Sequence, residues 1–184
     1  MKKVIIPLAD GLEEIEAVTG IDTLRRAGIG VTTVSLDNNL QIKGDHDIYL
    51  KADKIIDNIE VDNIDGIVLP GGMPGSKNLK ENKKLRELIK KVNNENGLLA
   101  AICAAPIVLE AAGVLQKKNA TSYPGFEKEM PSCNYREERV VKDDNIITAR
   151  GPGVALEFAL TIVSTLIDEQ KAEELSKQMI TSEV

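Results

Sequence analysis

Short apolar runs alternate with longer amphipathic segments along this chain, and this alternation constrains the fold more than any other feature. Residues 2–8, 31–36, 65–72 and 98–102 each hold an aliphatic run of strand length, as in strands that are buried on both faces. The segments between them are long enough for helices, which is typical of βαβ units rather than hairpins. The pattern predicts one α/β domain over residues 1–184, with a mostly parallel, doubly wound sheet.

Five segments are predicted to be helical: residues 13–28, 82–97, 106–113, 153–167 and 168–180. The first ends at a favourable Gly28, and near-helical intervals separate its positions Ile15, Val18, Ile21, Asp22 and Leu24. Residues 37–59 are polar and mixed, with short β candidates around 47–50, and are expected to hold an irregular excursion or a small hairpin. Residues 139–149 could form a second hairpin.

Composition and charge exclude several classes of function. The 23 basic residues are dispersed among 29 acidic ones and the net charge is −6, which argues against direct binding of nucleic acid. No apolar stretch approaches the roughly 20 residues that span a bilayer. Two cysteines without a CxxC pair or a signal peptide favour the cytoplasm and argue against a structural disulfide. Neither GxGxxG nor GxxxxGK is present, and we expect no cofactor.

Cys103 lies where a predicted strand ends and a predicted helix follows, in "AAICAAP". The N-terminus of a helix stabilises a thiolate. The small neighbours Ala101, Ala104 and Ala105 permit the sharp turn that exposes a nucleophile. The alternative is a buried cysteine that packs as a small hydrophobic residue.

Two other segments are expected beside Cys103, because the carboxyl ends of parallel strands share one edge of the sheet. Gly71 and Gly72 would let the backbone approach closely and direct amides toward an oxyanion, although a glycine pair is also simply a turn. Glu16 would share one proton with a neighbouring thiolate, because the two negative charges repel each other. Glu13 and Glu14 are explained by the preference of acids for helix starts.

Four motifs, in this order, resemble the ThiJ/PfpI superfamily: "PLADGLEEIEAV", "VLPGG", "AAICAAP", and "ARGPG" followed by "EFAL". The likeness covers residues 2–167 and is greatest to the small single-domain branch, which includes a Parkinsonism-associated deglycase and its bacterial relatives. The resemblance implies a flavodoxin-like sandwich, related to the class I glutamine amidotransferases, that forms a homodimer. It also implies that Cys103 is the nucleophile and redox-sensitive sulfur, with Glu16 as its protonated partner. The amides of Gly72 and Ala104 would form the oxyanion site, and Arg26 would lie near the pocket at the dimer interface.

The resemblance further implies glyoxalase or deglycase activity on reactive carbonyls or glycated amines and thiols, protection against oxidative stress, and chaperone activity. Older members carry links to thiamine biosynthesis or proteolysis. Proteolysis is disfavoured here, because Ala104 stands where the protease-like branch has a histidine after the cysteine. Tyr123 stands where the deglycase branch often has a histidine before a proline, and tyrosine, with a reference pKa of about 10, is a poor base.

His46 is the only histidine, and relatives carry a pocket arginine near its position. It would assist the pocket of its own or the partner subunit, or it is a solvated loop residue. Asp45 and Asp47 flank it, but a strand would send neighbouring side chains to opposite faces, so we expect no metal site. Cys133 is interpreted as a loop thiol.

Three hypotheses follow. The first is a stress-response enzyme in which the Cys103 thiolate attacks dicarbonyls and a hydroxy acid is released. The second is a non-enzymatic sensor in which Cys103 is oxidised to a sulfinate, with a chaperone or signalling output. The third is a plain α/β interaction module with an inert cysteine.

Overall fold

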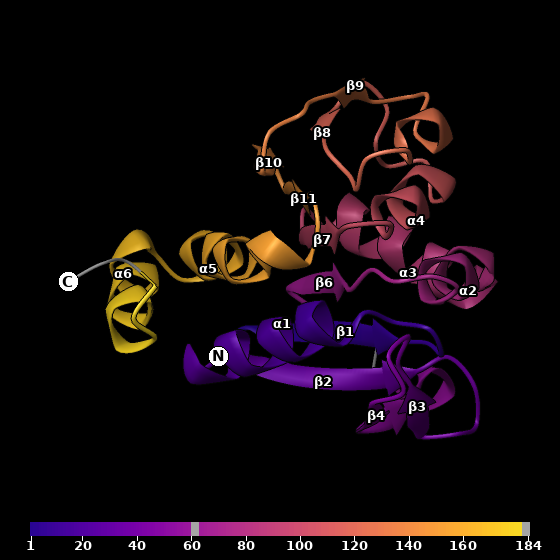
Figure 1. The fold of residues 1–184 in the computed structure, drawn as a ribbon, viewed down its shortest axis with the longest axis horizontal. Coiled ribbons are helices and arrows are strands. Elements are labelled where there is room, and N and C mark those ends of the chain that lie inside the picture. Colours follow the sequence, from indigo (N-terminus) through magenta and orange to yellow (C-terminus); the bar gives the residue numbers. More distant parts are fainter. Residues whose placement is uncertain (60–62, 182–184) are drawn as a thin grey trace.

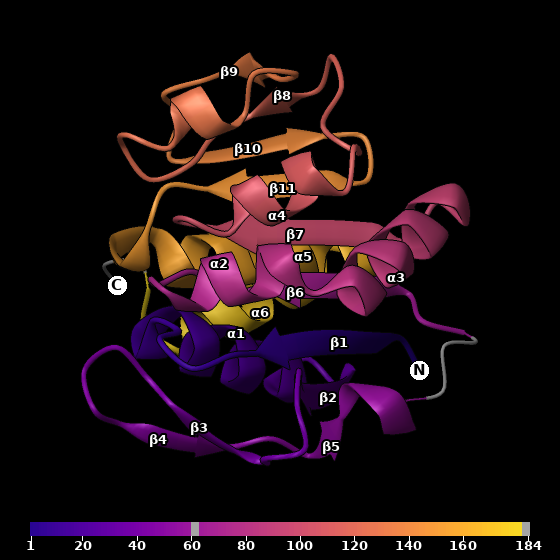
Figure 2. The same cartoon turned by 90° about the vertical axis from the view of Figure 1, so that its right-hand side faces the viewer.

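The computed structural model describes residues 1–59 and 63–181, and a seven-stranded sheet forms its centre. The strand order is β10-β11-β7-β6-β1-β2-β5, which Figure 2 shows from top to bottom. Only β10 runs antiparallel to its neighbour. The predicted mostly parallel, doubly wound sheet is confirmed. The strands are β1 (Lys3–Leu8), β2 (Gly30–Ser35), β5 (Lys54–Ile55), β6 (Gly66–Leu69), β7 (Leu98–Ile102), β10 (Val140–Asp143) and β11 (Ile146–Ala149).

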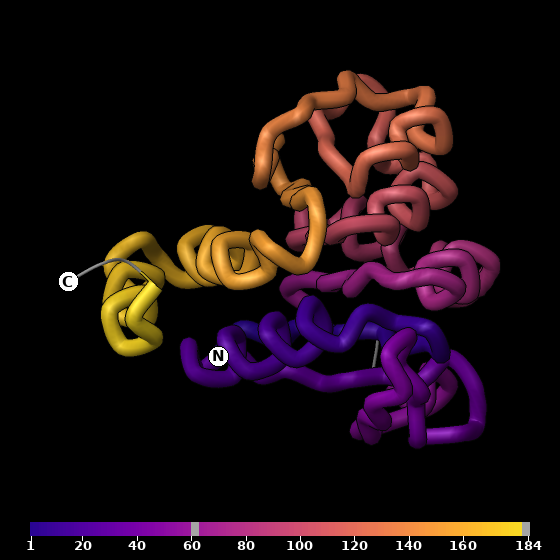
Figure 3. Tube along the Cα trace, in the orientation of Figure 1, coloured from indigo at the N-terminus to yellow at the C-terminus, as the bar shows by residue number. Residues whose placement is uncertain are grey.

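Helices cover both faces of this sheet, and each face has its own hydrophobic core. One face packs against α1 (Glu14–Arg26), α5 (Ala155–Leu166) and α6 (Glu169–Gln178), with Leu24 and Phe158 in its core. The other face packs against α2 (Gly75–Glu81), α3 (Lys83–Asn94) and α4 (Pro106–Ala111), with Leu85 and Val108 in its core (Figure 1). The tube in Figure 3 shows the first helix, in indigo, near the gold α5, which it contacts.

Short elements complete the fold. An antiparallel hairpin joins β3 (Gln41–Lys43) to β4 (Tyr49–Lys51), and a parallel pair joins β8 (Asn119–Ala120) to β9 (Asn134–Tyr135). Three turns of 3-10 helix lie at η1 (Ile56–Asn58), η2 (Glu127–Glu129) and η3 (Pro152–Val154). The hairpins expected near residues 47–50 and at 139–149 are both present. No helix in the described ranges has the length and apolarity needed to cross a membrane.

The start of helix α1 buries a different face from the one that its apolar spacing indicates, whereas Leu24 is buried as expected. Ile15 is 58% exposed and Val18 is 45% exposed, whereas Glu14 and Glu16 are each 4% exposed. The two carboxylates are buried because distant segments of the chain supply hydrogen-bond donors for them. Helix α2 was not expected, because the glycines of residues 71–75 indicated only a turn. A single domain over residues 1–184 stays a prediction.

Candidate active site

Cys103 occupies the sharp turn between β7 and α4. Its φ of 62° lies in the left-handed region, which residues other than glycine rarely adopt. Neighbours hold this backbone on both sides: the Cys103 amide donates to the Ala149 carbonyl at 2.9 Å, and the Cys103 carbonyl accepts from the Tyr123 amide at 2.8 Å. The surrounding structure therefore fixes a strained residue at the carboxyl edge of the sheet, as expected of a nucleophile.

Gly71 is the point at which Glu16 and Cys103 meet. The Gly71 amide donates to Glu16 Oε2 at 2.8 Å. A Cβ atom at Gly71 would lie 2.6 Å from that same oxygen and 2.6 Å from the Cβ of Cys103. Any larger residue would separate the carboxyl from the thiol, so the close approach expected from the glycine pair is present.

Two further amides face the sulfur. Those of Gly72 and Ala104 lie near enough to the Cys103 thiol to lower its pKa. Gly72 has a φ of 90°, and a Cβ there would collide with the backbone of Leu12 and Glu13. Two amides beside the thiol could stabilise a negative oxygen that forms there on carbon or sulfur, as in an oxyanion site.

Burial dominates the electrostatics of this pair. It raises the pKa of Glu16 to about 7, although the hydrogen bond from the Gly71 amide acts to lower it. Burial and the charge of Glu16 raise the pKa of the Cys103 thiol to about 12, although the amides of Gly72 and Ala104 act to lower it. The expectation of a helix-stabilised thiolate is therefore corrected: the proton rests on sulfur. Helix α4 is only six residues long and begins at Pro106, so its dipole cannot outweigh the loss of water around the sulfur.

One carboxyl oxygen at the site has no partner. Glu16 Oε1 is buried without a hydrogen bond among the described residues, although the carboxyl is close enough to Cys103 to influence its pKa. A buried polar atom left unpaired costs stability, of the order of 1–3 kcal/mol. Such an atom is typical of a position that a reacting group or a proton fills.

His46 contacts the start of α1 rather than Cys103. Its Nδ1 lies 2.8 Å from Glu14 Oε2, and its amide donates to Glu14 Oε1 at 2.7 Å. The hydrogen bond that the imidazole makes to the Glu14 carboxylate raises the pKa of His46. Asp47 pairs with Lys43 instead of His46. The histidine thus connects the β3–β4 hairpin to α1, and Glu14, which the sequence explained only as a helix start, has a specific partner 32 residues away.

The other predicted residues divide into two groups. Tyr123 lies beside the turn, with its amide on the Cys103 carbonyl and its ring close to Gly151, and it is 47% exposed. Arg26 is not brought to the site of its own chain: its Nε donates to Asp22 at 2.6 Å, and ten residues of α1, about 15 Å, separate it from Glu16. Its place at a dimer interface stays a prediction.

Cys133 differs from Cys103 in its surroundings. Both thiols are free and partly buried. The Cys133 sulfur lies 3.3 Å from the Met130 carbonyl, and its pKa is raised by burial and by Glu110. No oxyanion donors converge on it among the described residues, so it offers a matched control for the chemistry of Cys103.

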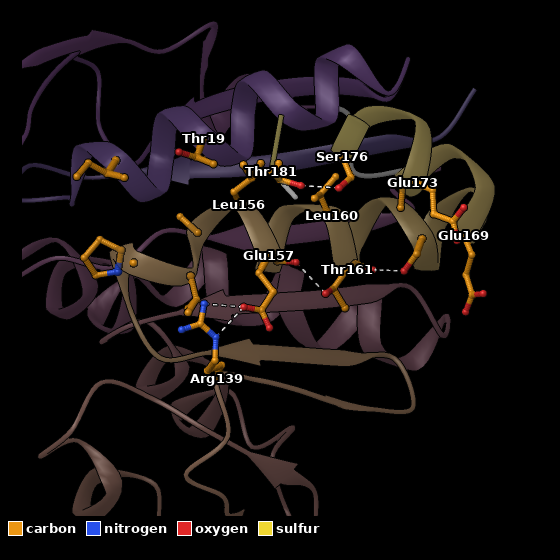
Figure 4. A pocket seen from close by; sticks show the side chains of 17 residues that line it. Thr19, Arg139, Leu156, Glu157, Leu160, Thr161, Glu169, Glu173, Ser176 and Thr181 are labelled. Atoms are coloured by element: carbon orange, nitrogen blue, oxygen red, sulfur yellow. Dashed lines mark hydrogen bonds and ion pairs between the residues drawn. The ribbon is translucent and has the colours of Figure 1, made fainter. Parts of the chain in front are cut away.

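A large groove of about 750 Å³ lies apart from the cysteine, between α1, α5 and α6 (Figure 4). Its lining includes Ile15, Thr19 and Leu160, and the ion pair of Arg139 with Glu157 stands on one wall. Cys103 and Glu16 do not line it. The outer surface of α1 therefore contributes to a separate hollow, whereas its inner surface contributes to the candidate active site.

Comparison with known proteins agrees with this geometry. Residues 2–165 match the model of the DJ-1/PfpI family. Protein dj-1beta of Drosophila melanogaster is 39% identical over 98% of both chains, and glutathione-independent glyoxalase DJR-1.2 of Caenorhabditis elegans is 33% identical over 96% of this chain and 94% of its own length. Protein DJ-1 homolog B of Arabidopsis thaliana is 41% identical, but this chain spans only 41% of its length.

A solved structure agrees equally well. That of Toxoplasma gondii DJ-1 in its oxidized form superposes with a TM-score of 0.94 at 38% identity, covering 98% of both chains. The sequence motifs, the fold and the strained cysteine therefore lead to one conclusion: the chain belongs to the DJ-1/PfpI family.

Proposed function

We propose that this protein is a carbonyl-stress enzyme that uses Cys103 to convert small 2-oxoaldehydes, such as methylglyoxal, into 2-hydroxy acids. One observation carries the proposal: the Cys103 side chain meets the Glu16 carboxyl and two converging amides, those of Gly72 and Ala104. The glyoxalase name of the Caenorhabditis elegans relative supports the substrate class. Early adducts of the same carbonyls with amines and thiols present the same carbon to the sulfur and are included in the substrate class.

The first step is addition of sulfur to the aldehyde carbon. The S–H proton passes to the Glu16 carboxylate as the carbon–sulfur bond forms, and the carbonyl π electrons move to oxygen. The amides of Gly72 and Ala104 stabilise this oxyanion. Because the pKa of Glu16 is about 7 and that of the thiol about 12, the thiol is protonated at neutral pH and about half of the molecules carry the Glu16 carboxylate that the step needs. A preformed thiolate is not required.

The second step moves hydrogen within the adduct. Glu16 first gives the thiol proton to the oxyanion, which makes a hemithioacetal and restores the carboxylate. The carboxylate removes the proton from the former aldehyde carbon and passes it to the ketone oxygen, which gives an enediol. It then takes the hydroxyl proton of the first carbon and delivers it to the neighbouring carbon. The first carbon is thereby oxidised to a thioester while the ketone carbon is reduced to an alcohol. Water hydrolyses the thioester, releases the hydroxy acid and restores the thiol. The net change is addition of one water molecule, so no external oxidant or reductant is needed.

The test is to follow methylglyoxal loss and lactate formation with the full-length protein. We expect Cys103→Ser to lose at least about 99% of the activity, in line with the large effects of removing a nucleophile. Cys133→Ser should retain wild-type activity, because its sulfur lacks the two amide donors. Equal activity in Cys103→Ser and wild type would contradict the proposal, as would loss of methylglyoxal without lactate.

A second function is favoured by the unpaired Glu16 Oε1 and the two amides. These groups can hold the oxygens of a Cys103 sulfinate, which forms when two peroxide molecules oxidise the thiol and leave two water molecules. The oxidized Toxoplasma gondii structure is consistent with such a state. The test is to measure the intact mass after mild peroxide treatment. If two oxygens are added selectively, and Cys103→Ser abolishes this addition, the result supports a sensor with chaperone output. If no selective oxidation occurs, the result favours the inert interaction module.

We also infer that the protein is a cytoplasmic homodimer. Ile15 and Val18 are exposed on the outer surface of α1, and Ile48 and Tyr49 are exposed at the tip and second strand of the β3–β4 hairpin. Exposed apolar side chains on these two elements would suit an interface between subunits. A second copy on this surface would also bring Arg26 toward a pocket, as the family resemblance implies.

A further inference from the structure

Three potential metal ligands from two separate elements meet beside the hairpin: Glu13 and Glu14 at the start of α1, and His46 between β3 and β4. One ligand atom from each lies within 4.8 Å of the others. The His46 Nδ1 and Glu14 Oε2 are already 2.8 Å apart, close to the roughly 3 Å that separates neighbouring ligands on an ion with bonds of about 2.0–2.1 Å. An ion bound there would take the place of the proton between His46 Nδ1 and Glu14 Oε2.

The backbone around these side chains holds them in place. Gly44, in the hairpin, packs so closely on Glu14 that a Cβ there would lie 2.1 Å from Glu14 Oε1. The amide of Asp45 donates to the Leu12 carbonyl at 2.9 Å, so the turn that carries the histidine is tied to the residue before Glu13 (Figure 2). The two elements therefore present their donors in a fixed arrangement and not by chance contact of mobile side chains.

The charges at this position lack a full counter-charge. Glu13 is 9% exposed and Glu14 is 4% exposed, and neither forms an ion pair with lysine or arginine among the described residues. Glu13 Oε2 accepts from the Glu16 amide at 2.7 Å, and its other oxygen is not among the buried polar atoms that lack a partner in the described part of the chain, so it remains open to a ligand from solvent. Buried carboxylates are normally paired or bound to a metal. Here a single, exposed imidazole stands opposite two of them.

We propose that Glu13, Glu14 and His46 form a binding site for a first-row divalent transition-metal ion, with Zn²⁺ as the reference ion. Two carboxylates and one imidazole suit borderline ions of this kind, whereas Ca²⁺ and Mg²⁺ prefer oxygen ligands alone. His46 binds through Nδ1, and its side chain, 67% exposed, leaves Nε2 directed to solvent. Three protein ligands leave further coordination positions for water. This site is distinct from the Cys103 sulfur and goes beyond the proposed carbonyl chemistry.

The experiment must exclude binding by thiols, because Zn²⁺ also binds cysteine. We would use tag-free full-length protein carrying Cys103→Ala and Cys133→Ser, titrate it with Zn²⁺ by calorimetry, and follow the imidazole signals by NMR. His46 is the only histidine, so these signals report on one residue. We expect one ion per chain and a shift of the His46 signals that saturates at the same ratio.

Three variants in that background decide whether the site is the one proposed. His46→Ala and Glu14→Gln should each weaken Zn²⁺ binding by about tenfold or more. Asp45→Asn, a change in the neighbouring exposed acid, should leave the affinity within twofold. His46→Ala alters an exposed side chain, so it remains informative if Glu14→Gln disturbs folding. Absence of stoichiometric binding, or equal affinity in His46→Ala, would overturn the proposal.

Discussion

The start of helix α1 departs from the usual arrangement of an amphipathic helix, although Ala17 and Leu24 pack into the core. Its inner face buries Glu14 and Glu16, and its outer face exposes Ile15 and Val18. A surface helix normally places apolar side chains toward the core and charges toward water. The difference teaches that two constraints other than core packing act on this helix: the chemistry at the sheet edge on the inner face, and contact with a further surface on the outer face.

The inner face carries a stability cost that the outer face does not. Glu16 has no cationic partner among the described residues, and only the Gly71 amide and its contact with Cys103 compensate its burial. Burying a carboxylate in this way is unfavourable unless it serves a function. Exposed Ile15 and Val18, in contrast, cost little in a folded monomer but favour association.

The largest expected effect tests the inner face through catalysis. Glu16→Gln cannot accept the thiol proton, so we expect methylglyoxal turnover to fall by about 10²–10⁴-fold. In the wild type, kcat/KM should rise with pH through about 7, because Glu16 acts as a base only when it is ionised. The measurement is a pH profile of lactate formation for both proteins.

Val18→Ala is the matched control on the outer face of the same helix. It should leave the turnover per chain within about twofold, because Val18 points away from Cys103. A wild-type profile that is flat between pH 5 and 9, or Glu16→Gln activity close to that of wild type, would remove Glu16 from the mechanism.

The next effect concerns stability and depends on pH. The pKa of Glu16 is raised from 4.5 to about 7 in the folded chain, so between these values the folded state holds a proton that the unfolded state has lost. Stability contributed by the protonated carboxyl is present at low pH and is lost as pH rises toward 7. Relative to Glu16→Gln, the wild-type free energy of unfolding should fall by about 3 kcal/mol between pH 4.5 and 8. Denaturant unfolding at several pH values would measure this, and parallel curves for the two proteins would contradict it.

A smaller effect is expected on the outer face, where assembly and not folding should respond. Ile15→Lys combined with Val18→Lys places charges on surface that is already exposed, so the free energy of unfolding of the monomer should change by less than about 0.5 kcal/mol. The dimer dissociation constant should rise by at least about tenfold. Light scattering over a dilution series measures it, with Thr165→Lys, on another part of the surface, as the control. An unchanged dissociation constant would place the interface elsewhere.

The comparison also shows how far sequence reasoning extends. Strand and helix patterning predicted the parallel sheet, and the turn at Cys103 followed from its small neighbours. The thiol pKa was wrong in direction, because burial depends on atoms far away in the sequence. The apolar spacing of Ile15 and Val18 indicated a core face, but periodicity does not tell which side of a helix meets the sheet. The contact between Glu14 and His46 joins residues 32 apart, and no local pattern encodes it.

The smallest effect tests that contact directly, at the point where the inner face of α1 meets the hairpin. The hydrogen bond to the Glu14 carboxylate raises the pKa of His46 above its ordinary value. The pair is therefore stabilised below that value and loses this stabilisation as pH rises through the raised pKa. An NMR titration of the single imidazole, with a chelator present, should give a midpoint above that of an exposed histidine, and Glu14→Gln should lower it. Asp45→Asn should lower it less, because Asp45 acts only through its charge and forms no hydrogen bond with the ring. If the midpoint is the same in wild type and Glu14→Gln, the buried carboxylate does not hold the histidine, and the inner face of α1 then serves Cys103 alone.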